Sequence, residues 1–453
     1  MTPGGRIQAV IDLLTAIAAM PRPADGVLRA FFRERRYMGA KDRHGVADMT
    51  WAILRRQARL AWWVIHAAAR LQRRTVALSD RDGNGTMRWI VLAYLVLVEG
   101  RTIAALAGLS RDDHGPAGLS QEERDMLATM AGRPLEHSAM PRWVRCELPP
   151  WLEGPLHACF GTALGHELVA LNAEAPLDLR VNTLKTAREE ARALLAAEGI
   201  ESHPTPFSPV GLRVVNRVDI TTCPPFREGL VEVQDEGSQL VALLTDARPG
   251  QAVADYCAGA GGKTLALAAC MANRGRLIAC DISPGRLERA ARRLRRAGVY
   301  NVTSHLLEGH TDSWYKRARD RFDRVLADVP CTGTGTWRRN PDARWRLQPE
   351  DVAELTARQA DILLRAGRLV RPGGRLIYAT CSLLAAENET QVERFLAESP
   401  AFHPVPAASA WAGSVGRLWS FDSSSPFLHL TPARQGTDGY FVAVLEKGEE
   451  HGM

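Results

Sequence analysis

Apolar residues in the first third of the chain recur at helical spacing. In one stretch they stand three, four or seven positions apart, which places them on one face of a helix; they are Met49, Ile53, Leu60, Val64, Ala67 and Leu71. The same spacing predicts helices over 87–98 and 120–130, and the second of these opens with the capping-box pair Ser120 and Glu123. We therefore predict an all-α domain over residues 1–145.

Alternating apolar and polar positions, which are typical of strands, begin at Leu177. Together with a helical linker before them, they predict a small α+β unit over 146–235. After residue 236 apolar strands alternate with helices, as in an α/β fold. This order predicts a doubly wound parallel sheet of Rossmann type over 236–449. Its strands are expected at 252–256, 277–280, 302–305, 324–327, 375–379 and 440–445, with helices from Lys263, Gly285, Pro349 and Glu387 between them.

The composition is that of a folded protein. Of 453 residues, 46% are hydrophobic and 24% are charged, a balance that excludes a disordered or fibrous chain. The longest apolar stretch, residues 90–98, is far shorter than the roughly 20 residues that a membrane span needs. The net charge of +6, carried almost wholly by arginine, permits a polyanionic partner without requiring one.

The eight cysteines include no C-x-x-C pair, so the pattern does not indicate a structural zinc site. Their scatter through apolar segments favours reduced thiols in a cytosol over a disulfide framework. We expect a cytoplasmic protein with no bound metal and no association with a membrane.

A glycine-rich turn follows the first strand expected in the α/β region. Residues 255–264 read D-Y-C-A-G-A-G-G-K-T, and the second strand ends about twenty residues later at Asp281. Glycines let a ligand approach the backbone closely, and an acid at the end of the second strand can accept both ribose hydroxyls. The pair indicates an adenosine cofactor. The rival interpretation is a nucleotide-hydrolysing P-loop, but Cys257 occupies its first glycine position.

Two later strands end in polar turns that contain cysteine. One turn reads D-V-P-C and ends at Cys331; the other reads T-C-S around Cys381 and is followed by Glu387. Because these strands are neighbours in the expected topology, two thiols and a carboxylate converge beside the cofactor cleft. A lone cysteine at a strand end is usually a small buried hydrophobe, whereas two in such turns indicate a reactive site.

These turns resemble the motifs of the RNA 5-methylcytosine methyltransferases of the NOL/NOP/Sun family, in its RsmB-like branch. The shared motifs are C-A-x-x-G-G-K-T from Cys257, D-x-P-C-T-x-x-G from Asp328, and T-C-S with a following E-N-E. Upstream signatures match at 179–185 and 233–239, so the resemblance covers about residues 177–448. It implies an enzyme that transfers a methyl group from S-adenosyl-L-methionine to C5 of a cytosine in RNA, with a small RNA-binding unit before the catalytic domain.

The resemblance also implies roles for the site residues. Cys381 is the nucleophile that adds to C6 of the cytosine, and Cys331 is the second thiol, which helps to release the product. Asp328 hydrogen-bonds the edge of the base, with Lys263 close to both. The cofactor is expected along the glycine-rich turn and the neighbouring strand ends, at Cys257, Ala258, Gly259, Ala260, Gly261, Gly262, Lys263, Asp281, Glu308, His310, Asp328 and Pro330.

Two positions depart from the motifs of the family. Ala260 stands where the family usually has proline, and residues 308–310 read E-G-H where it commonly has G-D-G. The family uses that aspartate to hold the adenine amino group. Either Glu308 or His310 replaces it, or the contact is lost.

The sequence R-Y-M-G-A-K-D-R at 36–43 resembles the NusB-type RNA-binding domain that heads the bacterial small-subunit ribosomal RNA methyltransferase B branch. This resemblance implies small-subunit (16S) ribosomal RNA as the substrate and a part in rRNA processing. The alternatives are methylation of transfer RNA and a catalytically idle RNA-binding assembly factor. We expect the protein to act as a monomer.

Two arginine-rich stretches are candidates for contact with RNA phosphates. Six arginines crowd residues 286–296, where a solvated helix face is an equal alternative. The second stretch adjoins the D-V-P-C turn, and its tryptophans can stack on bases as well; it comprises Trp337, Arg338, Arg339, Arg344, Trp345 and Arg346.

Overall fold

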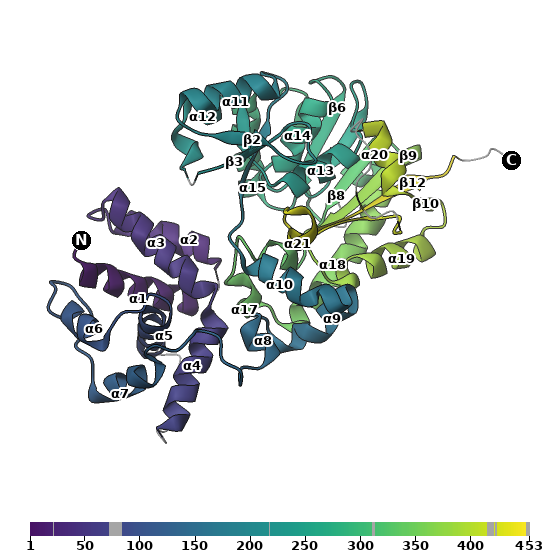
Figure 1. Ribbon diagram of the computed structural model, residues 1–453. Coiled ribbons are helices and arrows are strands. Elements are labelled where there is room, and N and C mark those ends of the chain that lie inside the picture. Colours follow the sequence, from purple (N-terminus) through teal and green to yellow (C-terminus); the bar gives the residue numbers. More distant parts are fainter. Residues whose placement is uncertain are drawn as a thin grey trace. The chain divides into compact units, whose positions relative to one another are not determined.

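The computed structural model describes residues 1–20, 22–71, 84–216, 218–309, 313–414, 421 and 424–449. Its contacts divide the chain into two compact units, which can be followed by colour in Figure 1. The first, which we call the helical unit, comprises Met1–Ala173 and Trp337–Leu347; the second, the sheet unit, comprises Glu174–Thr336 and Gln348–Met453. The division into domains at residues 145 and 235 stays a prediction.

Every element described in the helical unit is a helix. Ser120 and Glu123 form the expected capping box at the start of α7, and α5 covers all but the last residue of the range expected at 87–98. The helices are α1 (Pro3–Ala19), α2 (Ala24–Glu34), α3 (Ala40–Leu54), α4 (Gln57–Arg70), α5 (Asn84–Leu97), α6 (Ile103–Leu109), α7 (Gln121–Met130), α8 (Arg142–Arg145), α9 (Glu153–Phe160), α10 (Leu164–Asn172) and α17 (Ala343–Arg346), with short 3-10 turns at Pro150–Leu152 and Gly161–Ala163.

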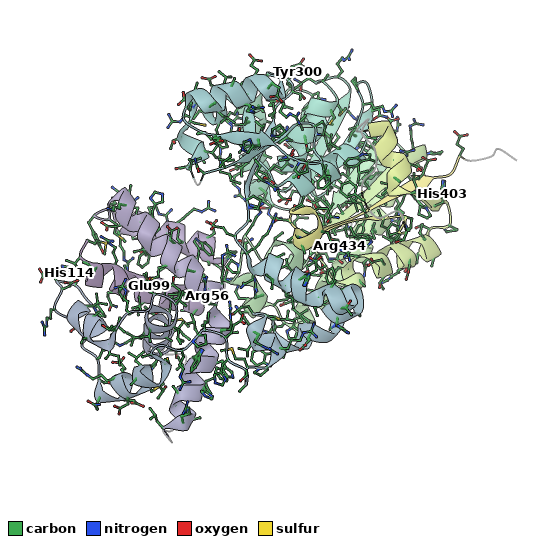
Figure 2. All side chains as sticks on the ribbon, in the orientation of Figure 1. Arg56, Glu99, His114, Tyr300, His403 and Arg434 are labelled. Atoms are coloured by element: carbon green, nitrogen blue, oxygen red, sulfur yellow. The ribbon has the colours of Figure 1, made fainter. Side chains whose placement is uncertain are left out.

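The single helix expected around residues 48–71 is in fact two helices, α3 and α4. They part at Arg56, which is labelled in Figure 2. The Glu147 carboxylate accepts the first free amides of α4, from Ala58 at 2.7 Å and Arg59 at 3.2 Å, and so supplies the N-terminal acceptor that a helix start requires. The apolar spacing hides the break because Ile53 and Leu60 are both buried in the same core.

The segment 337–347 packs inside the helical unit although it is distant in sequence. Trp337 and Arg344 have only 0% and 1% of their surface exposed, and the Arg344 guanidinium lies over the Trp337 ring at 5.0 Å. Arg344 Nη1 also donates to the Glu147 carbonyl oxygen at 2.8 Å. The expectation that this stretch contacts RNA is therefore wrong for these two residues, because protein already covers them.

The sheet unit begins with a small antiparallel sheet whose strand order is β2-β3-β1-β4. Its central strand β1 pairs with β3 on one side and with β4 on the other. Two helices, α11 and α12, accompany it, and residues such as Leu179 and Leu212 form its own apolar core. The elements are β1 (Leu177–Val181), α11 (Arg188–Ala197), β2 (Ser202–Pro204), β3 (Gly211–Val214), α12 (Pro224–Arg227) and β4 (Val231–Val233), with a 3-10 turn at Ile220–Thr222.

The larger sheet has the strand order β10-β12-β9-β8-β5-β6-β7, with β11 paired to β12. The strands are β5 (Ala252–Asp255), β6 (Arg276–Asp281), β7 (Val302–Leu306), β8 (Phe322–Asp328), β9 (Val370–Thr380), β10 (Phe402–Val405), β11 (Leu428–Leu430) and β12 (Tyr440–Lys447). Strands β8 and β9, which carry the two cysteine turns, are neighbours as expected.

The sheet is mixed rather than wholly parallel. Strands β5 to β9 run parallel, but β12 runs antiparallel to β9, β10 and β11. The expectation of a parallel sheet is wrong at this edge, where β12 pairs antiparallel with β9. The connection between β11 and β12 is also shorter than the dozen or more residues of the crossover that a parallel pair needs.

Helices cover both faces of the larger sheet, so its strands are apolar on both sides. One face packs on α13, α14 and α20, with α15 against α14, and the other on α16, α18 and α19. These helices are α13 (Glu236–Leu244), α14 (Gly262–Cys270), α15 (Pro284–Ala297), α16 (Trp314–Ala318), α18 (Pro349–Gly367), α19 (Glu389–Glu398) and α20 (Ala407–Ser414), with α21 (Pro432–Gln435) and 3-10 turns at Thr334–Thr336 and Ala385–Glu387. Among the described residues, no helix combines the length and apolarity required to cross a bilayer.

The small sheet is joined to the larger one by buried polar contacts. Asn182 Nδ2 donates to the carbonyl oxygens of Gly229 and Ala297, each at 2.8 Å. Gly229 also lies close to the end of α15. A Cβ atom on Gly229 would lie 2.5 Å from the Arg296 carbonyl oxygen. The two sheets therefore meet over the C-terminal end of α15.

Candidate active site

The glycine-rich turn lies between the end of β5 and the start of α14. Gly259 and Gly261 both have positive φ, at 55° and 80°, conformations that favour glycine. A Cβ on Gly261 would also lie 2.9 Å from the Cβ of Ala290 on α15. The backbone N–H of Gly259 donates to Asp281 Oδ2 at 2.9 Å, so the acid at the end of β6 helps to shape the turn.

A cavity of about 450 Å³ opens beside this turn, within the range of pockets that hold small ligands. Cys257, Asp281 and Pro330 line it, as do the apolar side chains of Ile282 and Leu307. Asp281 is 4% exposed and accepts one backbone N–H on each oxygen, which leaves each oxygen a further lone pair. Apolar walls and a fixed carboxylate fit the base and ribose of an adenosine cofactor.

The third strand contributes to the cavity differently from the expectation. Gly309 lines it, whereas Glu308 is exposed and is absent from the lining. His310 lies outside the described residues. Of the two residues expected to hold the adenine amino group, the structure therefore does not bring Glu308 to the cavity.

Lys263, at the start of α14, is paired with Asp328 at the end of β8. Its Nζ atom lies 2.6 Å from Asp328 Oδ2. Burial lowers the pKa of Lys263, but attraction to Asp328 outweighs that effect and the pKa lies above its usual value. The lysine therefore remains charged, and its ammonium is bound to a carboxylate instead of standing ready for a nucleotide phosphate.

The two cysteine turns bring their thiols together. Cys331 Sγ lies 3.4 Å from Cys381 Sγ, within sulfur hydrogen-bond distance. The hydrogen bond to Cys381, followed by burial, raises the pKa of Cys331 well above its usual value. Cys331 therefore stays protonated at neutral pH. The Lys263 ammonium also interacts electrostatically with Cys381.

Glu387 holds the turn that carries Cys331. It is fully buried, and its carboxylate accepts the backbone N–H of Thr332 at 2.9 Å, the Thr332 hydroxyl, and Gln359 Nε2 at 2.9 Å. Gln359 Nε2 also donates to the Pro330 carbonyl oxygen at 2.9 Å. The carboxylate expected beside the thiols is thus a support behind the turn.

The turn that carries Cys381 has its own supports. The Thr380 hydroxyl donates to Asn388 Oδ1 at 2.5 Å, and Asn388 Nδ2 donates to the Ser382 carbonyl oxygen at 3.0 Å. The backbone N–H of Gly335 donates to the Cys381 carbonyl oxygen at 2.9 Å. Sequence reasoning did not single out these partners, or Gln359, although the position of Asn388 in E-N-E was a signal for one of them.

Comparison with known proteins follows this geometry. The family model described as "16S rRNA methyltransferase RsmB/F" matches residues 242–446, and that of the "Methyltr_RsmF/B-like, ferredoxin-like domain" matches 148–221. The ribosomal RNA small subunit methyltransferase B of Pseudomonas syringae pv. tomato is 33% identical over 331 residues, which cover 73% of this chain and 71% of that protein. The chain belongs to the RsmB/F methyltransferase family.

A second relative and a solved structure show further likeness to this chain. The probable ribosomal RNA small subunit methyltransferase B of Synechocystis sp. is 37% identical over 302 residues, or 66% of each chain, so this chain matches about two thirds of the length of that relative. The crystal structure of PH0851 has 26% identity and a TM-score of 0.78, over 99% of both chains. The small sheet is therefore the ferredoxin-like domain of an RsmB/F protein, and the larger sheet is its Rossmann-like methyltransferase domain.

Proposed function

We propose that this protein transfers a methyl group from S-adenosyl-L-methionine to C5 of a cytosine in small-subunit ribosomal RNA. The observation that carries the proposal is the pair of thiols, 3.4 Å apart, at adjacent strand ends next to the Lys263–Asp328 ion pair. The names of the relatives, which are small-subunit ribosomal RNA methyltransferases, support the choice of RNA. Their names do not specify the atom that is methylated.

S-adenosyl-L-methionine supplies an electrophilic methyl group when it is bound. Asp281 would hold its ribose and the backbone from Cys257 to Gly262 would contact it, while Pro330 lines the same cavity as Cys257 and Asp281. By the same resemblance, Lys263 and Asp328 would also contact the cofactor. Their side chains meet where the start of α14 adjoins the end of β8.

The two thiols divide the chemistry of the pyrimidine. C5 of cytosine is a weak nucleophile, and addition of the Cys381 thiolate to C6 turns the ring into an enamine whose C5 can attack a methyl group. Asp328 hydrogen-bonds the edge of the base and orients the ring. After methyl transfer C5 gives its proton to water, the electron pair of that C–H bond re-forms the C5–C6 double bond, and the Cys381 sulfur leaves C6 as a thiolate, with the Cys331 S–H group assisting this release.

The target cytosine has to leave its stack to reach these strand ends, or to be presented in a single-stranded loop. We propose that residues 1–145 form a NusB-like RNA-binding domain that helps to present it. Tyr37 supports this idea, since 73% of its surface is exposed in the loop after α2. The charged neighbours Arg36 and Lys41 are exposed as well.

The test is transfer of labelled methyl from S-adenosyl-L-methionine to separate pools of unmodified small-subunit ribosomal RNA and transfer RNA, with bisulfite mapping of the product. We expect label at one cytosine of the ribosomal RNA. Cys381→Ala should abolish transfer and leave cofactor binding intact. Cys331→Ala should accumulate a protein–RNA adduct that survives denaturation.

The outcomes separate the alternatives. Label in transfer RNA would keep the chemistry and overturn the choice of substrate. Cofactor binding without transfer to either pool would favour a preassembled particle as substrate or an idle assembly factor. Normal turnover by Cys331→Ala, with no adduct, would show that the roles of the two thiols are assigned wrongly.

A further inference from the structure

The peptide between the two left-handed glycines of the cofactor turn is held from outside the turn. Arg293 Nη1, on α15, donates to the Ala260 carbonyl oxygen at 2.8 Å. Ala260 lies between Gly259 and Gly261, the residues with the greatest backbone freedom in the turn. A fixed carbonyl at this point restricts rotation of the whole 259–261 stretch.

The same guanidinium also contacts the ferredoxin-like domain. Arg293 Nη2 donates to Glu232 Oε2 at 3.0 Å, and Glu232 lies on β4 with 2% of its surface exposed. Arg296 forms a second ion pair with Glu232, and its guanidinium lies 4.1 Å from the centre of the Phe226 ring. Glu232 is thus an anchored acceptor, fixed by two arginines.

Most of the other arginines on α15 are placed differently. Arg289, Arg292 and Arg295 are exposed, whereas the Arg293 side chain is only 27% exposed. Arg286 lies nearer the start of the helix, where its Nη1 atom is 3.8 Å from Asp281 Oδ2. A solvated helix face therefore accounts for Arg289, Arg292 and Arg295 but not for Arg293, which is turned toward the cofactor turn.

We infer that Arg293 is a positioning residue that clamps the cofactor turn to the ferredoxin-like domain through Glu232 and so sets the affinity for S-adenosyl-L-methionine. The inference rests on the proposed function only in naming that cofactor. The planar fork of arginine allows both hydrogen bonds at once, whereas lysine has a single ammonium that cannot reproduce the fork. Without the clamp the turn populates other conformations. The apparent Kd for the cofactor then equals the intrinsic Kd divided by the fraction of molecules whose turn is competent to bind.

The first experiment measures binding of S-adenosyl-L-methionine to the full-length protein by calorimetry, together with KM and kcat for methyl transfer. Arg293→Gln should raise both the Kd and the KM for the cofactor by about tenfold, since it removes a charged hydrogen bond, with kcat at saturation nearly unchanged. Arg293→Lys should lie between this variant and the wild type. The matched control is Arg292→Gln, next to it on the exposed face, which should bind like the wild type.

The second experiment needs neither cofactor nor activity. Hydrogen exchange of the free protein should show faster exchange of the Gly261 and Gly262 amides in Arg293→Gln and, to a smaller degree, in Glu232→Gln, which keeps the bond to Ala260 but loses the anchor. Exchange in the core strand β6 should not change. This readout separates a local clamp from a general loss of stability.

Wild-type exchange at Gly261 and Gly262 in Arg293→Gln, with cofactor affinity within twofold of the wild type, would overturn the inference. A wild-type protein that binds no S-adenosyl-L-methionine would instead contradict the proposed function, and the exchange data would still decide whether the clamp exists. If Arg293→Gln lowers both the Tm and kcat but leaves the KM for the cofactor unchanged, Arg293 has a structural role only.

Discussion

Asp255, at the end of β5, is a buried acid with one unsatisfied oxygen. It is 1% exposed; Oδ2 accepts the Thr264 hydroxyl at 2.6 Å, and Oδ1 has no hydrogen-bond partner among the residues that the structure describes. Burial raises the pKa of Asp255 to about 7, with the nearby carboxylates Asp328 and Asp281 adding to the effect and Thr264 and Lys263 opposing it. The residue is therefore protonated in the folded protein at pH values where the unfolded chain has already lost that proton.

This difference makes the contribution of Asp255 to stability depend on pH. Its pKa is higher in the folded state than the ordinary value of 3.8, so its contribution is fully present below pH 4 and is lost as the pH rises through 7. Asp255→Asn should remove the dependence and be more stable than the wild type at pH 8, by at most about 4 kcal/mol. Denaturant unfolding of both proteins at pH 5, 6, 7 and 8 checks this, and parallel pH dependences would contradict it.

Single residues also show what sequence reasoning could reach. Cys331, Cys381, Lys263 and Asp328 could be singled out because each stands in a short motif at a strand end. The burial of Arg344 could not, because a run of arginines and tryptophans reads the same whether its side chains face solvent or a core. Buried supports such as Gln359 belong to no motif, and only the fold brings them to the site.

Among the elements, the 3-10 turn Ala385–Glu387 supports the Cys331 turn through Glu387. Glu387→Gln replaces one carboxylate oxygen with an NH2 group. That NH2 group then faces the N–H and O–H donors of Thr332 and Gln359, so two donors meet with no acceptor between them. We expect kcat for methyl transfer to fall roughly ten- to a hundredfold, the scale of a small displacement of a reacting group. Cofactor affinity should change little, because Glu387 is not part of the cavity lining.

A matched control for Glu387→Gln is Glu389→Gln, the other acid of E-N-E. The Glu389 side chain is 34% exposed and faces His429 at 3.5 Å, so this variant should keep wild-type activity. Radiolabelled methyl transfer and calorimetric cofactor binding, measured on both variants, provide the comparison. Equal activities would mean that the buried carboxylate does not position Cys331.

The elements themselves were predictable to the extent that their signals are local. Apolar runs bounded by turns gave β5, β6, β8 and β9 to within a few residues. The break between α3 and α4 was not predictable, since its acceptor is Glu147, far along the chain. The direction of β12 was missed as well, because the apolar pattern of a strand covered on both faces is the same in either orientation.

At the scale of the whole molecule, the path of the chain is not a simple series of domains. The chain leaves the sheet unit after Thr336, contributes 337–347 to the helical unit, and returns at Gln348. Periodicity divides a sequence into consecutive pieces, so it does not reveal an excursion of this kind. The excursion begins only a few residues after Cys331, directly after the 3-10 turn Thr334–Thr336.

This path predicts how the sheet unit behaves on its own. A fragment of residues 174–453 keeps segment 337–347 but loses the helical core against which Trp345 packs. The fragment exposes a large aromatic side chain, and the guanidinium of Arg344 loses its carbonyl acceptor on Glu147. We expect it to aggregate or to unfold at a lower temperature than the sheet unit within the full chain.

The same fragment with Trp337→Ser and Trp345→Ser, which removes the newly exposed aromatic surface, should remain monomeric to higher concentration in size-exclusion chromatography with light scattering. If the unmodified fragment is soluble and melts with the same Tm as the full chain, segment 337–347 does not depend on the helical unit for its stability.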